Sequence, residues 1–193
     1  MDPLAIIKRY NIRPSKGLGQ NFLISERAFD CILAAADLTP DDVVLEVGPG
    51  IGSLTRRLAD RAGRVVAIEL DRKMLAVLGE TLAGRENVSL VEGDFLALDP
   101  VATLRGALAP AEPLRDWKLV ANLPYYITSA ALRHVLTAAH RPERLVVMVQ
   151  RDVAQRIVAA DQKFSLLAVS VHVFGIPKVA CTVPAGAFYP PPK

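Results

Sequence analysis

The chain has 193 residues, of which 51% are hydrophobic and 22% are charged, and its formal net charge is +3. This composition excludes a disordered or fibrous chain, and the length fits one domain with a full hydrophobic core. The mild positive charge permits a nucleic-acid partner without requiring one.

Segments with strand character alternate with helical segments along the chain. A short helix is expected at residues 3–7, with Asp2 as its N-cap, and a second helix, capped by Ser25, is expected to extend through residue 36. Strands are expected at residues 43–47, 65–68, 88–91, 119–121 and 145–149, and helices at 54–62, 72–82, 101–108, 129–139 and 152–160. Residues 165–174 fit either a strand or a buried helix, and residues 178–183 indicate a further strand. The alternation predicts an α/β fold with a mostly parallel sheet flanked by helices.

The sequence has only two cysteines, Cys31 and Cys181, and neither belongs to a CxxC motif or a His/Cys cluster. This argues against a disulfide scaffold and a zinc site and favours a reducing compartment, with both side chains in the core. The longest apolar runs fall short of the roughly 18 residues of a membrane span, and the first residues lack a signal-peptide pattern. We therefore expect a cytoplasmic protein without membrane association.

A glycine-rich turn follows the first strand of the expected sheet, in Glu46-Val47-Gly48-Pro49-Gly50. Glycines at this position let the backbone turn sharply and approach a ligand at the edge of the sheet. The pattern departs from the dinucleotide fingerprint, because Ser53 only half satisfies the last small position and Pro49 lacks an N–H for a pyrophosphate. The turn suits a nucleoside without phosphates, and a plain strand-to-helix turn is the alternative.

Two acidic residues follow the next two strands. Glu69 comes 21 residues after Gly48, where a carboxylate accepts the ribose hydroxyls of a bound nucleoside. Asp94 follows the third strand, where it can accept the exocyclic amine of an adenine, and Phe95 can flank the ring. Either acid could instead cap a helix or lie in solvent. The three features at successive strand ends together predict S-adenosylmethionine as the cofactor.

The fourth strand ends in Asn122-Leu123-Pro124-Tyr125. An exocyclic adenine nitrogen is a poor nucleophile, because its lone pair is delocalised into the ring. The Asn122 amide oxygen and the Leu123 carbonyl can each accept one N–H of this amine, Pro124 stiffens the turn, and Tyr125 offers a face for the flipped-out base. A plain strand-to-loop turn is again the alternative.

These four residues resemble the catalytic motif of N6-adenine methyltransferases, in the form typical of RNA enzymes. The segments Gly19–Leu23, Glu46–Gly50 and Phe188–Lys193 resemble motifs of the ribosomal RNA adenine dimethylase family, most closely its KsgA-type members. The motifs occur in the family's order and cover nearly the whole chain. The resemblance implies a Rossmann-like, S-adenosylmethionine-dependent methyltransferase catalytic domain over residues 1–193.

The resemblance also implies the site residues and the substrate. The implied catalytic residues are Asn122, Leu123, Pro124, Tyr125 and Phe188, with Tyr125 and Phe188 enclosing the target adenine. The implied cofactor contacts are Asn21 and Leu23 at the methionine end, Gly48 in the glycine loop, Glu69 at the ribose, Asp94 at the adenine, and Asn122; no metal is expected. The implied substrate is a pair of adjacent adenines in a hairpin loop near the 3′ end of small-subunit (16S) rRNA, each of which receives two methyl groups.

Two other functions stay open at this point. Antibiotic-resistance methyltransferases, which modify an adenine of large-subunit rRNA, share the glycine-rich motif. A non-catalytic rRNA-binding assembly or transcription factor could keep the fold, although the intact Asn122 and Tyr125 speak against it. We expect a monomer that works on small-subunit rRNA or a ribosomal-subunit precursor. Lys8, Arg9, Arg13 and Lys16 fit either a solvated surface or an RNA-backbone contact.

The family usually continues after the proline segment into a final strand and a small helical domain, whereas this chain stops at Lys193. We therefore expect the C-terminal helical domain to be absent, RNA to bind poorly, and Phe188 to be weakly anchored.

Overall fold

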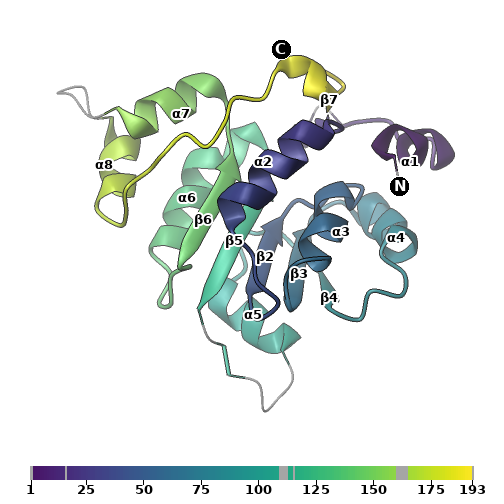
Figure 1. The fold of residues 1–193 in the computed structure, drawn as a ribbon, viewed down its shortest axis with the longest axis horizontal. Helices are drawn as coiled ribbons and strands as arrows, with labels where there is room; N and C mark the ends of the chain where they lie inside the picture. The colour runs from purple at the N-terminus through teal and green to yellow at the C-terminus, as the bar shows by residue number, and fades with distance from the viewer. Residues whose placement is uncertain (1, 16, 109–112, 115, 160–164, 193) are drawn as a thin grey trace.

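The computed structural model describes residues 2–15, 17–108, 113–114, 116–159 and 165–192 (Figure 1). Lys16, Lys193 and the expected helix end at residue 160 lie outside these ranges. The α-helices are α1 Pro3–Arg9, α2 Glu26–Ala36, α3 Ser53–Ala59, α4 Arg72–Thr81, α5 Pro100–Ala107, α6 Thr128–Leu136, α7 Arg151–Val158 and α8 Leu166–His172. The strands are β1 Phe22–Leu23, β2 Val43–Val47, β3 Arg64–Glu69, β4 Val88–Glu92, β5 Trp117–Asn122, β6 Arg144–Met148 and β7 Phe188–Tyr189, and the short 3-10 helices are η1 Tyr125–Ile127 and η2 Ala185–Ala187.

Among the described residues, five strands form a parallel sheet in the order β4-β3-β2-β5-β6, which confirms the predicted α/β class (Figure 1). Strand β2 is central and all of its residues are buried, as expected for a short apolar run covered on both faces. The chain builds β3 and β4 on one side of β2, and β5 and β6 on the other. This reversal creates a crevice at the carboxyl ends of the strands, where ligands bind in open α/β sheets.

Alternate residues of the strands face two separate cores. On one face, Val44 and Val65 pack with α2 and α3, including Phe29 and Leu58, which are fully buried. The opposite face is covered by α5 and α6, whose buried side chains pack with the other alternate residues of β2, β3 and β5. Successive residues of a strand point to opposite faces of the sheet. Because both faces of the sheet are covered at its centre, β2 is apolar at every position except Glu46.

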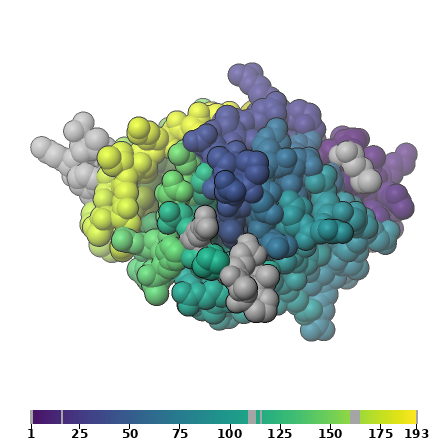
Figure 2. All heavy atoms as spheres, turned by 60° about the horizontal axis from the view of Figure 1, so that its bottom comes forward, coloured from purple at the N-terminus to yellow at the C-terminus, as the bar shows by residue number. Residues whose placement is uncertain are grey.

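Helix α1 forms a third, smaller core with α4. Asp2 caps α1 as predicted, accepting hydrogen bonds from Leu4 N at 3.2 Å and Ala5 N at 3.3 Å. Ile6 and Ile7 pack with Phe22, Ile51, Met74 and Val77. This packing fixes the start of the chain beside α4, on the opposite flank of the molecule from α7 and α8 (Figures 1 and 2).

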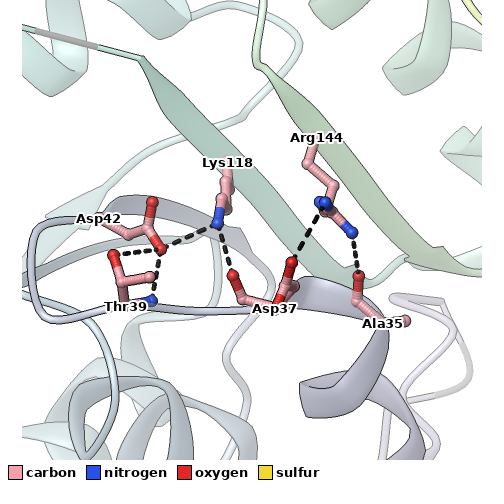
Figure 3. A network of polar contacts seen from close by, with 6 residues as sticks. All are labelled: Ala35, Asp37, Thr39, Asp42, Lys118 and Arg144. Atoms are coloured by element: carbon pink, nitrogen blue, oxygen red, sulfur yellow. Dashed lines mark hydrogen bonds and ion pairs between the residues drawn. The ribbon is translucent and has the colours of Figure 1, made fainter.

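A polar network fastens the α2–β2 loop to β5 and β6 (Figure 3). The Lys118 ammonium donates to Asp37 O at 2.7 Å and to Asp42 Oδ2 at 2.9 Å. The same Asp42 oxygen accepts bonds from the backbone N–H and the hydroxyl of Thr39, at 2.6 and 3.2 Å. Arg144 adds a more exposed contact, donating to Ala35 O at 3.2 Å and to Asp37 Oδ2 at 3.4 Å. Because Lys118 and Asp42 stand near the amino ends of their strands, the network holds the end of the sheet opposite the crevice.

The C-terminal third departs from the sequence expectations. Residues 166–172 form helix α8, which Ser165 caps, but only Ala168 of this helix is buried. The strand expected at residues 178–183 is wrong, because this segment is extended coil without strand pairing.

Cys31 and Cys181 form a disulfide bond, with 6.6 Å between their Cα atoms and a sequence separation of 150. The prediction of two unpaired core cysteines is therefore wrong: Cys31 is half-buried on α2, and Cys181 is exposed on the coil that precedes η2. The bridge holds this coil against α2. Two single cysteines so far apart carry no local spacing signal, so the sequence did not indicate the pairing.

Strand β7 pairs with β1 in an antiparallel ladder, with Leu23 opposite Phe188 and Phe22 opposite Tyr189. Ile24 N also donates to Ala187 O at 2.8 Å. Phe188 is only 4% exposed and packs in the α2–α3 core, so the expectation that it would be weakly anchored is wrong. Within the described ranges, no helix has the length and apolar character needed to cross a bilayer.

Candidate active site

A cavity of about 230 Å³ opens at the carboxyl ends of β2, β3, β4 and β5. The sequence-predicted residues that line it are Asn21, Leu23, Gly48, Glu69, Asp94, Asn122, Leu123, Pro124 and Tyr125. They come from five separate parts of the chain, and the parallel sheet brings them together because its carboxyl ends share one edge. Of the predicted site residues, Phe188 alone is not part of this lining.

The glycine turn between β2 and α3 adopts backbone conformations that other residues rarely take. Gly48, Gly50 and Gly52 have φ angles of +68°, +58° and +77°. At Gly50 a Cβ atom would stand 3.2 Å from the Phe22 ring, so even a methyl group would crowd the N-terminal segment. The turn therefore needs glycine for conformation and for close approach, as the sequence pattern predicted.

Glu69 ends β3 with both carboxylate oxygens held by backbone groups. Gly50 N donates to Oε2 at 3.1 Å, and Asp71 N donates to Oε1 at 2.9 Å. The residue is 7% exposed, and burial, partly offset by these N–H groups, raises the pKa of its carboxyl. Each oxygen keeps acceptor capacity, so an oriented carboxylate is available to two adjacent hydroxyl groups.

Asp94 lines the cavity just after the end of β4 and is exposed. Its Oδ1 accepts from Leu96 N at 2.9 Å, which fixes the side chain in a local turn. Phe95 is 3% exposed and also lines the cavity, together with the apolar side chains of Ile51 and Ile68. This part of the lining can offer apolar surface to a ring and a carboxyl acceptor to an amine.

Glu46 is a lining residue that sequence reasoning named only as part of the glycine motif. It is 2% exposed, and its Oε2 has no hydrogen-bond partner among the described residues. Burial raises the pKa of its carboxyl to about 8; Thr55 opposes this shift, and the nearby Glu69 adds to it to a smaller degree. Glu46 is therefore mostly protonated at pH 7. Its place inside an apolar strand is the signal that could have identified it, because buried acids are rare without a role.

Asn122 ends β5 and joins it to the N-terminal segment. Its Nδ2 donates to Asn21 O at 3.2 Å. Because this bond uses the donor end of the amide, the Oδ1 acceptor is available to the amine of a ligand. Pro124 precedes η1, whose first residue, Tyr125, is half-buried, and burial raises the pKa of its hydroxyl.

Phe188 does not reach the cavity in this structure. Phe188 lies opposite Leu23 in the β1–β7 pair and packs in the α2–α3 core. Leu23 lines the cavity, whereas Phe188 does not. A stacking role for Phe188 therefore stays a prediction that would need the ring to leave this core.

The cavity chemistry fits an adenine nucleoside with a polar tail. It has carboxyl groups in Glu69 and Asp94 that can accept hydrogen bonds from hydroxyl and amine groups, and side-chain amides in Asn21 and Asn122. No group of three or more His, Cys, Asp or Glu residues suited to a metal occurs in the part of the chain that the structure describes.

Comparison with known proteins connects the chain to rRNA-modifying enzymes. A family model described as "Ribosomal RNA adenine dimethylase" matches residues 11–193. The "Ribosomal RNA small subunit methyltransferase A" of Dehalococcoides mccartyi (strain CBDB1) is 50% identical over 188 residues, covering 97% of this chain and 62% of the relative. The protein of the same description from Moorella thermoacetica (strain ATCC 39073 / JCM 9320) is 45% identical over 193 residues, covering 98% of this chain and 67% of the relative. The chain thus spans about two thirds or less of these relatives' lengths.

Two solved structures resemble the fold closely. A dimethyladenosine transferase from Plasmodium falciparum is 29% identical with a TM-score of 0.75, covering 89% of this chain and 59% of that one. The 23S rRNA methyltransferase ErmE is 30% identical with a TM-score of 0.71, covering 90% of this chain and 66% of that one.

Proposed function

Because the chain belongs to the ribosomal RNA adenine dimethylase family, we propose that it uses S-adenosylmethionine to methylate N6 of adenines in small-subunit rRNA. The observation that carries the proposal is the meeting of Asn122-Leu123-Pro124-Tyr125 with Glu69 and Asp94 around one cavity.

The lining offers a contact for each part of the cofactor in this proposal. Glu69 accepts the ribose hydroxyls, Asp94 accepts the adenine amine, and Phe95 flanks the ring. Gly48 and the segment from Asn21 to Leu23 border the methionine end. When bound, the cofactor supplies an electrophilic methyl group on a sulfonium, so the protein needs neither a nucleophile nor a metal for the transfer.

The protein's contribution is to prepare the target amine. Asn122 Oδ1 and the Leu123 carbonyl each accept one N–H, which favours a geometry in which the nitrogen lone pair points at the methyl group. Tyr125 stacks on the flipped-out base, a contact that contributes roughly 1–3 kcal/mol. The turn through Pro124 and η1 holds these groups in a fixed relation, because Ile127 N donates to Pro124 O at 3.1 Å.

The similarity to named relatives favours the small-subunit substrate. Relatives described as small-subunit methyltransferases reach 45–50% identity over nearly the whole chain, whereas the 23S rRNA enzyme ErmE reaches 30%. A second adenine methyltransferase activity on large-subunit rRNA is the alternative that the same geometry could perform.

The test is transfer of labelled methyl groups from S-adenosylmethionine to unmethylated small-subunit particles, with free large-subunit rRNA as the competing substrate. We expect N6,N6-dimethyladenosine at two adjacent positions of the small-subunit rRNA only. Asn122→Ala should abolish transfer without changing the melting temperature by more than a few degrees, because the side chain makes one backbone contact. Near-normal turnover by Asn122→Ala would refute the amine-positioning mechanism.

A further inference from the structure

Six consecutive residues, Leu18 to Leu23, line the cavity and form a strap along it. The strap meets the β5 side of the site at two points, Tyr126 and Asn122, and strand β7 holds its far end. Gly19, with a φ of +59°, leaves room for the Tyr126 ring, which would stand 3.4 Å from a Cβ atom there. Asn21 O accepts the bond from Asn122, and the β1–β7 ladder holds residues 22 and 23.

Gln20 ties the same strap to the β3 side. Its Nε2 donates to Asp71 Oδ2 at 2.9 Å, across 51 residues of sequence. Its Oε1 accepts from Ser15 N at 2.9 Å, and its own N–H donates to Ser15 O at 3.1 Å. The Gln20 side chain thus closes the loop before the strap and joins it to the start of α4.

Asp71 links Gln20 to a residue that lines the cavity, Glu69. Its backbone N–H is one of the two groups that orient the Glu69 carboxylate, at 2.9 Å from Oε1. Its side chain uses Oδ1 to cap α4 through Lys73 N at 3.0 Å, which leaves Oδ2 for Gln20. A continuous chain of contacts therefore runs from Gln20 through Asp71 to Glu69.

We propose that Gln20 is a positioning residue for ribose recognition: it holds Asp71 so that the Asp71 N–H aims the Glu69 carboxylate at the ribose hydroxyls. The inference rests on the proposed function, because it takes the ligand of Glu69 to be a ribose. Since Asn21 is bonded to Asn122, the adjacent residues Gln20 and Asn21 also connect the cofactor end of the site to the target-amine end.

The hydrogen-bond polarity of the Gln20–Asp71 pair allows a reversal test. Gln20→Glu keeps an acceptor for Ser15 N but places an oxygen against the Asp71 carboxylate. Asp71→Asn keeps an acceptor for Lys73 N, but it places a second N–H donor against Gln20 Nε2. In the double variant, the amide nitrogen at position 71 can donate to the carboxylate at position 20, so the hydrogen bond returns with donor and acceptor exchanged. Gln155→Glu is the matched control, because it makes the same chemical change on an exposed position of α7.

The measurement is calorimetric binding of S-adenosylhomocysteine and of its 2′,3′-dideoxy analogue, at a temperature where circular dichroism shows each variant folded. Each single variant should bind S-adenosylhomocysteine about tenfold more weakly, the effect of losing one hydrogen bond to a carboxylate. The double variant should return to within about threefold of the parent chain, and binding of the dideoxy analogue should stay nearly constant throughout. A purely structural role would weaken both ligands equally. Gln20→Ala, which removes both side-chain bonds without adding charge, should reproduce the single-variant loss and serves if Gln20→Glu does not fold.

The outcomes separate the two proposals. If the parent chain binds neither ligand, the cofactor assignment fails and the inference fails with it. If the parent chain binds S-adenosylhomocysteine and prefers it to the dideoxy analogue, but the single variants keep the same preference, the inference about Gln20 is overturned while the cofactor assignment stands. Failure of the double variant to recover ribose preference would also overturn it.

Discussion

Replacing Lys118 with methionine should destabilise the fold by about 3 kcal/mol. Removing one partner of a buried ion pair costs roughly 3–5 kcal/mol, because the other charge is left uncompensated. The Lys118 and Asp42 side chains are 7% and 13% exposed, and Asp42 would keep its two bonds from Thr39, so we expect a loss at the lower limit. For a domain of this size, that loss lowers the melting temperature by about 6–12 °C.

Arg144→Met is the matched control for this variant. Arg144 contacts the same loop from the neighbouring strand, but its side chain and that of Asp37 are 43% and 74% exposed. Exposed ion pairs contribute about 0–1 kcal/mol, so the free energy of unfolding of Arg144→Met should lie within about 1 kcal/mol of the parent value. Urea unfolding monitored by circular dichroism measures this free energy for both variants. Equal losses of stability in Lys118→Met and Arg144→Met would refute the assignment of a buried, stabilising pair.

The effect of Lys118→Met should also depend on pH. Burial is the largest influence on Asp42 and would raise its pKa, but hydrogen bonds from Lys118 and Thr39 outweigh it and lower the pKa. The folded pKa therefore lies below the unfolded value of roughly 3.9, and the pair stabilises the fold above that pH. This stabilisation is lost as the pH falls through the folded pKa. The difference between parent and variant should be constant near neutral pH and narrow below about pH 4, and a difference that widened there would contradict the argument.

Three further predictions concern the cavity and the disulfide. Glu69→Ala should weaken binding of S-adenosylmethionine by about 1–3 kcal/mol in calorimetry, because it removes a charged hydrogen-bond acceptor; unchanged affinity would exclude Glu69 from the site. Glu46→Gln should gain stability relative to the parent as the pH rises from about 4.5 to 8, since the raised pKa of Glu46 makes its stabilising contribution fade over that range. A constant difference in urea unfolding would count against this. Cys181→Ser should lower the free energy of unfolding by up to about 5 kcal/mol, because the bridge closes a loop of 150 residues; a reductant should bring the parent chain to the same level, and no change on reduction would disprove the effect.

The sheet and the cavity could be predicted because their signals are local. A short apolar run such as β2 indicates a strand buried on both faces, and glycines directly after it mark the turn at the ligand edge. Once the strands are parallel and adjacent, the ends of β3, β4 and β5 must meet at one edge. Glu69, Asp94 and Asn122 were therefore predictable as neighbours without any knowledge of their contacts.

The contacts that the sequence did not indicate join residues far apart in the chain. The Cys31–Cys181 bridge spans 150 residues, and the Gln20–Asp71 bond spans 51. Neither has a periodicity or a spacing that short-range patterns can detect, because both depend on how separate elements pack. The strand expected at residues 178–183 failed for a related reason: β-branched composition favours a strand, but whether the segment pairs with an edge strand such as β6 depends on tertiary packing.

The two buried acids of the cavity show how packing treats the same side chain differently. Burial raises the pKa of both carboxyls. Both oxygens of Glu69 accept backbone N–H bonds, which offset part of this effect, whereas Glu46 Oε2 has no partner among the described residues and its pKa is raised to about 8. The backbone donors therefore favour the ionised form of Glu69, and the described residues give Glu46 Oε2 no such donor. Under the proposed function, the oriented oxygens of Glu69 are the acceptors for the ribose hydroxyls. A Glu46 that is mostly protonated at pH 7 then adds little negative charge to a cavity that is proposed to take the carboxylate of the methionine end.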